Sequence, residues 1–104
     1  MNVEIHAHQL VLSDSAKDRI RDRVSRGLAR FDERVRAVHA WLSDENGPKG
    51  GVDAACRIQV QLVGANDVVI EERHSKAEGA VALAVGRMRR AVQKSLGREL
   101  QKRR

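Results

Sequence analysis

The sequence predicts an α+β domain with the element order β-α-β-β-β-α, in which a four-stranded mixed sheet carries two helices on one face. Three observations lead to this fold class: four short segments alternate apolar and polar residues, two long segments repeat apolar residues at helical spacing, and the 104 residues suffice for one hydrophobic core. Each segment has a single apolar side, so helices and sheet should bury these sides against each other. The first β-α-β link should be a right-handed parallel crossover, followed by an antiparallel meander.

The four expected strands are short and have one apolar face each. They cover residues 2–8, 38–42, 56–62 and 68–72. Residues 44–51, which are rich in glycine and contain the one proline, predict a turn between the second and third strands. The polar side of the strands carries His, Gln, Glu and Arg, which allows the outer face of the sheet to stay in water.

The two expected helices each carry one apolar stripe. The first is predicted over residues 14–34, with Ser13 or Ser15 as its N-cap, and the second begins at Ser75. Gly27 faces the core, where it costs about 1 kcal/mol relative to Ala, and close helix–sheet packing is the expected reason. The two stripes consist of Ile20, Val24, Leu28, Phe31 and Val35, and of Ala77, Val81, Ala84, Met88, Val92 and Leu96. We assign residues 1–100 to a single domain and residues 101–104 to a basic C-terminal tail.

Charge is unevenly distributed along the chain. Nine Lys or Arg against two Glu give residues 75–104 a net charge of +7, which leaves −1 of the chain's total of +6 for the rest. Arginine outnumbers lysine 15 to 5. The guanidinium group binds phosphate oxygens through two parallel hydrogen bonds, so this composition favours phosphate-bearing partners.

Other features narrow the setting in which the protein works. No apolar run approaches the roughly 20 residues of a membrane span, and the N-terminus lacks the basic start and apolar core of a signal peptide. The lone Cys56 lies in an alternating strand pattern, where a buried reduced thiol is expected. These features predict a cytoplasmic protein without a membrane partner.

The stretch "DRIRDRVSRGLARFDERVR", residues 18–36, contains seven arginines. On a helical wheel with Ile20 at zero, the apolar stripe spans roughly 0° to 80°, the arginine stripe roughly −120° to −40°, and Asp18, Asp22 and Asp32 lie at roughly 120° to 200°. The arginine stripe consists of Arg19, Arg23, Arg26, Arg30 and Arg34.

This separation of charge works mildly against helix stability. Only Asp22–Arg26 and Asp32–Arg36 are opposite charges four residues apart, whereas six pairs at that spacing carry like charges. Each like pair costs about 0.2–0.5 kcal/mol in an isolated helix. A surface for a polyanion explains the arrangement better than a plain solvated face, which is the alternative.

The second helix has a basic stripe on the same flank relative to its apolar stripe, at roughly −140° to −60° from Ala77. The helices should run in the same direction over the sheet, so we expect the two basic stripes side by side, about 8–10 Å apart. The late cations also suit the dipole at a helix C-terminus. The second stripe consists of Lys76, Arg87, Arg90, Lys94 and Arg98.

Two segments carry a resemblance to a known family. The first is "VEIHAHQLVLSDSAKDRIRDRV" near the start and the second is "AVGRMRRAVQKSLGREL" near the end. With the element order, they resemble the ribosome hibernation promoting factor and ribosome-associated inhibitor family, also called sigma modulation protein. The resemblance implies a fold similar to a double-stranded-RNA-binding domain with an added strand. It also implies a bacterial stress-response protein that sits in the mRNA and tRNA channel of the small ribosomal subunit and silences translation.

The resemblance extends to individual basic residues. Those of the family's two helices match Arg23 and Arg26, and Arg87, Arg90 and Lys94. Family members usually open the second helix with an Asp and, two residues on, a Tyr. "KAEGAVA" at residues 76–82 has neither, and the chain has no Tyr. Longer members add a C-terminal dimerisation domain, which we do not expect here.

No constellation for catalysis emerges from the sequence. The outer sheet face should carry His6, His8, His39 and Trp41, but no spacing supports a metal site, and solvated strand positions explain the histidines better. Trp41 either stacks on a base or packs half-buried. Cys56 has no Cys or His at motif spacing, the adjacent glutamates at 71 and 72 lack an apolar pocket with a second acid, and the glycines fit no phosphate loop. We therefore expect no enzyme activity, cofactor, metal or small-molecule substrate.

The sequence thus predicts a non-enzymatic ribosome-binding translation inhibitor. The arginines would hold rRNA phosphates while the body of the domain blocks the channel. The expected partner is the small ribosomal subunit with its rRNA, and away from the ribosome the protein should be a monomer. A generic structured-RNA-binding module and a regulator whose basic face meets an acidic protein are the alternatives.

Overall fold

The computed structural model describes the backbone of residues 1–44 and 53–102 and the side chains of residues 1–44 and 53–98. The turn expected over residues 44–51 lies, after Asp44, outside the described residues. The elements in chain order are β1 (Asn2–His8), α1 (Asp14–Gly27), the 3₁₀-helix η1 (Ala29–Arg34), β2 (Val35–Asp44), β3 (Ala54–Leu62), β4 (Val68–His74) and α2 (Ala77–Lys102).

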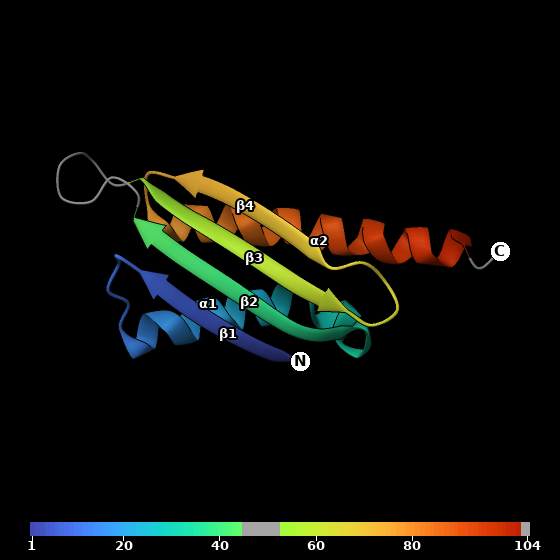
Figure 1. Ribbon diagram of the computed structural model, residues 1–104. Coiled ribbons are helices and arrows are strands. Elements are labelled where there is room, and N and C mark those ends of the chain that lie inside the picture. The colour runs from blue at the N-terminus through green and yellow to red at the C-terminus, as the bar shows by residue number, and fades with distance from the viewer. Residues whose placement is uncertain (45–52, 103–104) are drawn as a thin grey trace.

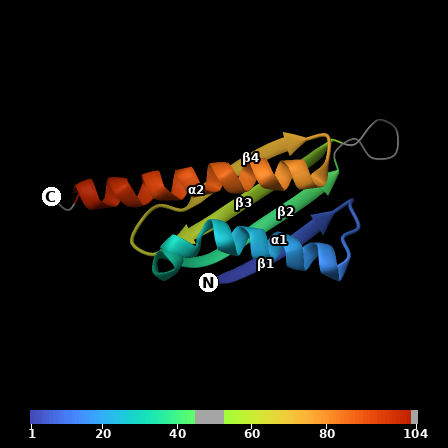
Figure 2. The ribbon, with the colours of Figure 1, turned by 180° about the vertical axis from the view of Figure 1, so that it is seen from behind.

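The sheet confirms the expected fold class. Its strand order is β1-β2-β3-β4, with β1 and β2 parallel and the other two pairs antiparallel. Both helices cover the same face and run in the same direction, while the other face is open (Figures 1 and 2). Among the described residues, no helix is both long and apolar enough to cross a membrane.

The core lies between the helix layer and the sheet. Apolar residues from the inner face of the strands meet the stripes of α1 and α2 there, and no polar or charged residue with a described side chain is buried. The largest fully buried side chains are Leu28, Leu42, Ile58, Met88, Val24, Val38, Val60, Val92 and Cys56. Burial raises the pKa of the Cys56 thiol from 9.0 to about 12, so this thiol is neutral at physiological pH.

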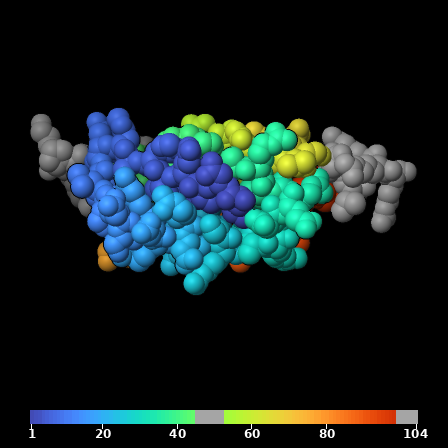
Figure 3. All heavy atoms as spheres, turned by 90° about the horizontal axis from the view of Figure 1, so that it is seen from below, coloured from blue at the N-terminus to red at the C-terminus, as the bar shows by residue number. Residues whose placement is uncertain are grey.

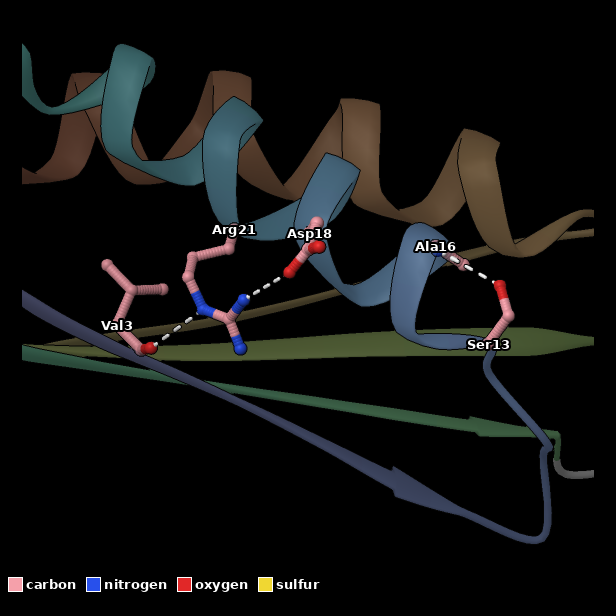
Figure 4. Close-up of polar contacts among 5 residues, drawn as sticks. All are labelled: Val3, Ser13, Ala16, Asp18 and Arg21. Atoms are coloured by element: carbon pink, nitrogen blue, oxygen red, sulfur yellow. Dashed lines mark hydrogen bonds and ion pairs between the residues drawn. The ribbon is translucent and has the colours of Figure 1, made fainter.

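The first helix begins as predicted but ends earlier than predicted. Ser13 is the N-cap, and its hydroxyl accepts a hydrogen bond of 3.0 Å from the backbone N–H of Ala16 (Figure 4). The prediction of one helix to residue 34 was wrong: α1 ends at Gly27, and η1 carries the chain into β2. A 3₁₀-helix keeps nearly helical side-chain spacing, so Phe31 extended the apolar pattern although the backbone had changed.

Strand β2 begins three residues before the predicted start. Val35 had been assigned to the helical stripe, but it is a buried strand residue whose partner is Leu62. The β2–β3 register then shifts between Val35 and Ala37, which leaves Arg36 at an irregularity of the ladder.

Gly27 lies at a close contact between the two helices. A Cβ atom at this position would lie 2.9 Å from Cγ1 of Val85 and 3.4 Å from Cε of Met88, both on α2. The expectation of helix–sheet packing was therefore wrong, because the glycine admits the neighbouring helix.

The start of α2 is fixed by a histidine. The backbone N–H of Lys76 donates to Nδ1 of His74 at 3.0 Å, and the Lys76 carbonyl accepts from Ala80 at 3.0 Å. The His74 ring occupies the space that a Cβ at Gly79 would need. The end of α2 reaches Lys102, within the segment assigned to the tail.

Candidate RNA-binding surface

Three arginines of the predicted first stripe line a groove between the two helices. Arg19, Arg23 and Arg26 project from α1 and are exposed to solvent. The opposite wall is the first part of α2, with Ala77, Glu78 and Val81. The groove therefore has a basic rim on α1, and α1 and α2 lie side by side along it (Figure 2).

One acidic residue of α1, Asp22, also lines the groove and pairs with one of the three arginines. Arg26 pairs with Asp22 at 3.1 Å, as the spacing predicted, but its side chain is 81% exposed, so the pair contributes little stability. Arg19 donates to the Ser15 hydroxyl at 3.0 Å. Within residues 1–44 and 53–98, no ion pair joins Arg19 or Arg23 to a carboxylate, so both are free for a phosphate.

Another arginine of α1 makes contacts that hold the helix against the sheet. Arg21 donates from Nε to the carbonyl of Val3 on β1 at 3.3 Å and from Nη1 to Asp18 at 2.8 Å (Figure 4). Its guanidinium therefore ties α1 to the edge strand.

The last two residues of the first stripe lie on η1. Arg30 is exposed, and its guanidinium carbon lies 5.4 Å from the centre of the Phe31 ring. Arg34 donates from Nε and Nη2 to the carbonyl of Val63 at 3.1 and 2.9 Å, and the N–H of Val63 donates back to the Arg34 carbonyl at 2.9 Å. Arg34 thus joins η1 to the end of β3.

The stripe on α2 faces away from α1. Arg87 donates to the Glu72 carboxylate at 2.9 Å and to the Glu71 carbonyl at 3.3 Å, both on β4 at the edge of the sheet. About two and three helical turns after Arg87, Lys94 and Arg98 line a hollow at the β3–β4 turn. Arg90 shares this flank of the helix and is exposed.

The expectation that the two stripes lie side by side was therefore wrong. The two helices are parallel, and each carries its basic stripe on the same flank. The basic flank of α1 therefore faces α2, whereas the basic flank of α2 faces away from α1, over β4. Figure 3, which views the β1 edge, accordingly shows β1 and α1 in front with α2 almost entirely behind them. The basic surface consists of two separated rows.

Two cations that the prediction left out lie close to these rows. Arg36, at the irregular start of β2, lines the same hollow as Lys94 and Arg98. Its position could have been predicted from the start of β2 at Val35, but the helical spacing of apolar residues included Val35 in the first helix. Arg89 is exposed and shares the helix face of Glu78, eleven residues earlier, so it lies on the side of α2 that borders the groove. Lys76 is exposed immediately before α2.

With this geometry, the chain can be compared with known proteins. A family model described as sigma 54 modulation protein / S30EA ribosomal protein matches residues 3–99. The chain belongs to this family. The resemblance found in the sequence is thereby confirmed, and the sigma 54 modulation family covers nearly the whole chain.

Solved structures show the same fold. The N-terminal domain of Thermus thermophilus Protein Y is 28% identical, with a TM-score of 0.68 over 90% of this chain and 98% of that chain. A ribosomal subunit interface protein from Coxiella burnetii is 11% identical, with a TM-score of 0.71 over 90% of this chain and 96% of that chain, and shares the fold. A comparison with curated protein sequences finds no significant match.

Proposed function

We propose that this sigma 54 modulation family protein binds the small ribosomal subunit through rRNA phosphates and inhibits translation by occupying the mRNA and tRNA channel. The observation that carries the proposal is the family match over residues 3–99. The exposed arginines and lysines of the helix layer support it, because they offer guanidinium and ammonium groups to a polyanion. The site of action is the cytoplasm, where ribosomes are found.

The contacts divide the predicted residues into two groups. Arg34 and Arg87 donate to groups of other elements, at Val63 and on β4, so we assign them mainly to the fold. The partners of Arg19 and Arg26 lie within α1 itself. Arg30 and Lys76 are exposed and stay in the proposal as peripheral contacts. The residues that we propose as the main phosphate contacts are Arg19, Arg23, Arg26, Arg90, Lys94 and Arg98.

Inhibition would follow from occupancy and not from catalysis. A phosphate contact needs only an exposed cation, and the folded domain supplies the volume that excludes mRNA and tRNA. The one cysteine is buried with a neutral thiol, and a thiol nucleophile reacts as the thiolate. The protein would act as a monomer without a cofactor.

Co-sedimentation with small ribosomal subunits tests the proposal. Two double variants, Arg19→Gln/Arg23→Gln and Arg90→Gln/Lys94→Gln, each remove two positive charges from one of the rows. Each should weaken binding about tenfold or more, and circular dichroism should show the fold intact because all four side chains are exposed.

The matched control is Arg57→Gln/Arg73→Gln. It removes the same charge from the open sheet face, where Arg57 borders the hollow beside Trp41 and Arg73 follows two residues after Glu71. The affinity of this control variant for small ribosomal subunits should change much less than that of the other two variants. Equal weakening by all three variants would reduce the proposal to non-specific charge attraction, and unchanged binding in all three would exclude the helix layer as the contact surface.

A further inference from the structure

The open face of the sheet brings two histidines and a glutamate together. Strands β1 and β2 pair in parallel with Glu4 opposite His39 and His6 opposite Trp41. Glu4 and His6 are two residues apart, so their side chains leave the same face of β1. The sequence predicted that the histidines share this face, but it did not predict the glutamate as part of the group.

The donor atoms of the three residues already lie at the spacing of metal ligands. Oε2 of Glu4 is 3.1 Å from Nδ1 of His39 and 3.7 Å from Nε2 of His6, and all three donor atoms lie within 4.8 Å of one another. A tetrahedral zinc ion with bonds of about 2.0–2.1 Å separates its ligand atoms by about 3.3 Å. The two distances to Glu4 bracket this value, so small side-chain rotations suffice to close a site.

The rings are held in position by their neighbours. His6, His39 and Trp41 lie with their ring centres 5.6 to 5.8 Å apart and their planes within 20° of parallel. On the other side of Trp41, the Arg57 guanidinium carbon lies 5.8 Å from the indole ring centre. Stacking on paired strands limits the rotamers of both imidazoles, which lowers the entropic cost of binding an ion.

We propose that Glu4, His6 and His39 form a binding site for a divalent transition-metal ion, with Zn²⁺ as its natural occupant. Two imidazole nitrogens and one carboxylate oxygen are ligands that suit Zn²⁺ and other divalent transition-metal ions, whereas Mg²⁺ and Ca²⁺ prefer sites built from oxygen ligands alone. The three side chains are 26% to 49% exposed, so water can reach the fourth position. The site lies on the sheet face opposite the helices (Figure 1), away from the residues that we propose as phosphate contacts.

The protein contains its own reporter for this site. Trp41 is the only tryptophan in the chain, and its ring centre is 5.6 Å from that of His6. Cu²⁺ quenches a nearby indole, so titration of the full chain, without a histidine tag, with CuSO₄ should give saturable quenching at one equivalent. Calorimetric titration with ZnSO₄ should also give one site in the micromolar range, while MgCl₂ should give none.

Variants locate the site. His39→Ala and His6→Ala should each weaken Zn²⁺ binding at least about tenfold, and His8→Ala should leave it unchanged. His8 is the matched control because it lies on the same strand, two residues beyond His6, and is not part of the group. Glu4→Gln keeps the volume and removes the charged ligand, so it gives the same test if a histidine variant fails to fold.

The proposal is overturned by either of two results. One is the absence of saturable Zn²⁺ binding below about 1 mM, a concentration that corresponds to only about −4 kcal/mol of binding free energy. The other is equal affinity in the wild type, His39→Ala and Glu4→Gln, which would place bound zinc elsewhere. Loss of binding in the site variants with retention in His8→Ala supports it.

Discussion

Replacement of Gly27 by alanine tests the packing of the two helices that carry the basic rows. The added Cβ would lie 2.9 Å from Cγ1 of Val85, about 0.6 Å or more inside the usual carbon–carbon contact distance. Val85 is β-branched and has few alternative rotamers in a helix. The clash can therefore be relieved only if α1 and α2 move apart or Val85 is forced from its rotamer.

Two opposing terms set the size of the effect. Forcing an extra methyl group into a packed contact costs about 1–3 kcal/mol, while replacing glycine by alanine in a helix gains at most about 1 kcal/mol. We expect a net loss of about 1 kcal/mol, which lowers the melting temperature by about 4–8 °C in a domain of this size.

Gly97→Ala is the matched control, because a Cβ at Gly97 meets nothing within 4 Å. It should raise the melting temperature by several degrees, since only the helix-propensity gain applies. Thermal unfolding followed by circular dichroism measures both variants. A Gly27→Ala protein that melts higher than the wild type, as Gly97→Ala should, would refute the close helix–helix contact.

Three further predictions follow from individual contacts. Arg34→Ala should destabilise the fold by about 1 kcal/mol, because both hydrogen bonds to Val63 are lost. The folded variant should bind ribosomes as the wild type does. A stable variant that no longer binds ribosomes would show that Arg34 is a ribosome contact. The Cys56 thiol, with its pKa raised to about 12 by burial, should not react with a disulfide reagent at pH 8 until urea unfolds the protein. In the unfolded state the pKa of the thiol is near its ordinary value of 9.0, so the unfolded state loses the thiol proton first. The stability of the fold should therefore decrease from pH 9 towards pH 12, and less so in Cys56→Ala. Reaction of the native protein with the reagent at pH 8 would contradict the burial of the thiol. Finally, six phosphate contacts predict that log affinity for ribosomes falls with log salt concentration at a slope of about −4 to −5; titrations at several KCl concentrations measure it, and a flat line would exclude phosphate contacts as the main source of affinity.

The fold class was predictable because every strand has one apolar face. Val38, Ala40 and Leu42 on β2 alternate with polar residues, and this period of two identifies a strand independently of its neighbours. The end of α1 was not predictable in this way. Leu28 and Phe31 continue the helical spacing, and only the tertiary demand that Val35 enter the sheet reveals the change to a 3₁₀-helix.

The candidate surface was predicted residue by residue but not as a whole. Helical angles correctly placed Arg19 and Arg23 at the surface, but they did not keep Asp22 apart from the arginines, because it lines the same groove and pairs with Arg26. They could not tell which neighbour each flank faces, since that depends on the order in which the helices lie on the sheet. The contact of Arg87 with Glu72, fifteen residues away, depends on the same tertiary arrangement. Likewise, pairing of Glu4 with His39 requires the register between β1 and β2.

The proposed mechanism requires the protein and the ligands of translation to compete for one channel of the small subunit. Its most direct test is the affinity of the protein for small ribosomal subunits with and without preloaded mRNA and initiator tRNA, at a fixed salt concentration. Preloading should abolish binding in proportion to occupancy, and the protein added first should prevent initiation in a cell-free translation reaction. Equal affinity for empty and preloaded subunits would place the binding site elsewhere and contradict the proposed mechanism, even if ribosome binding itself were observed.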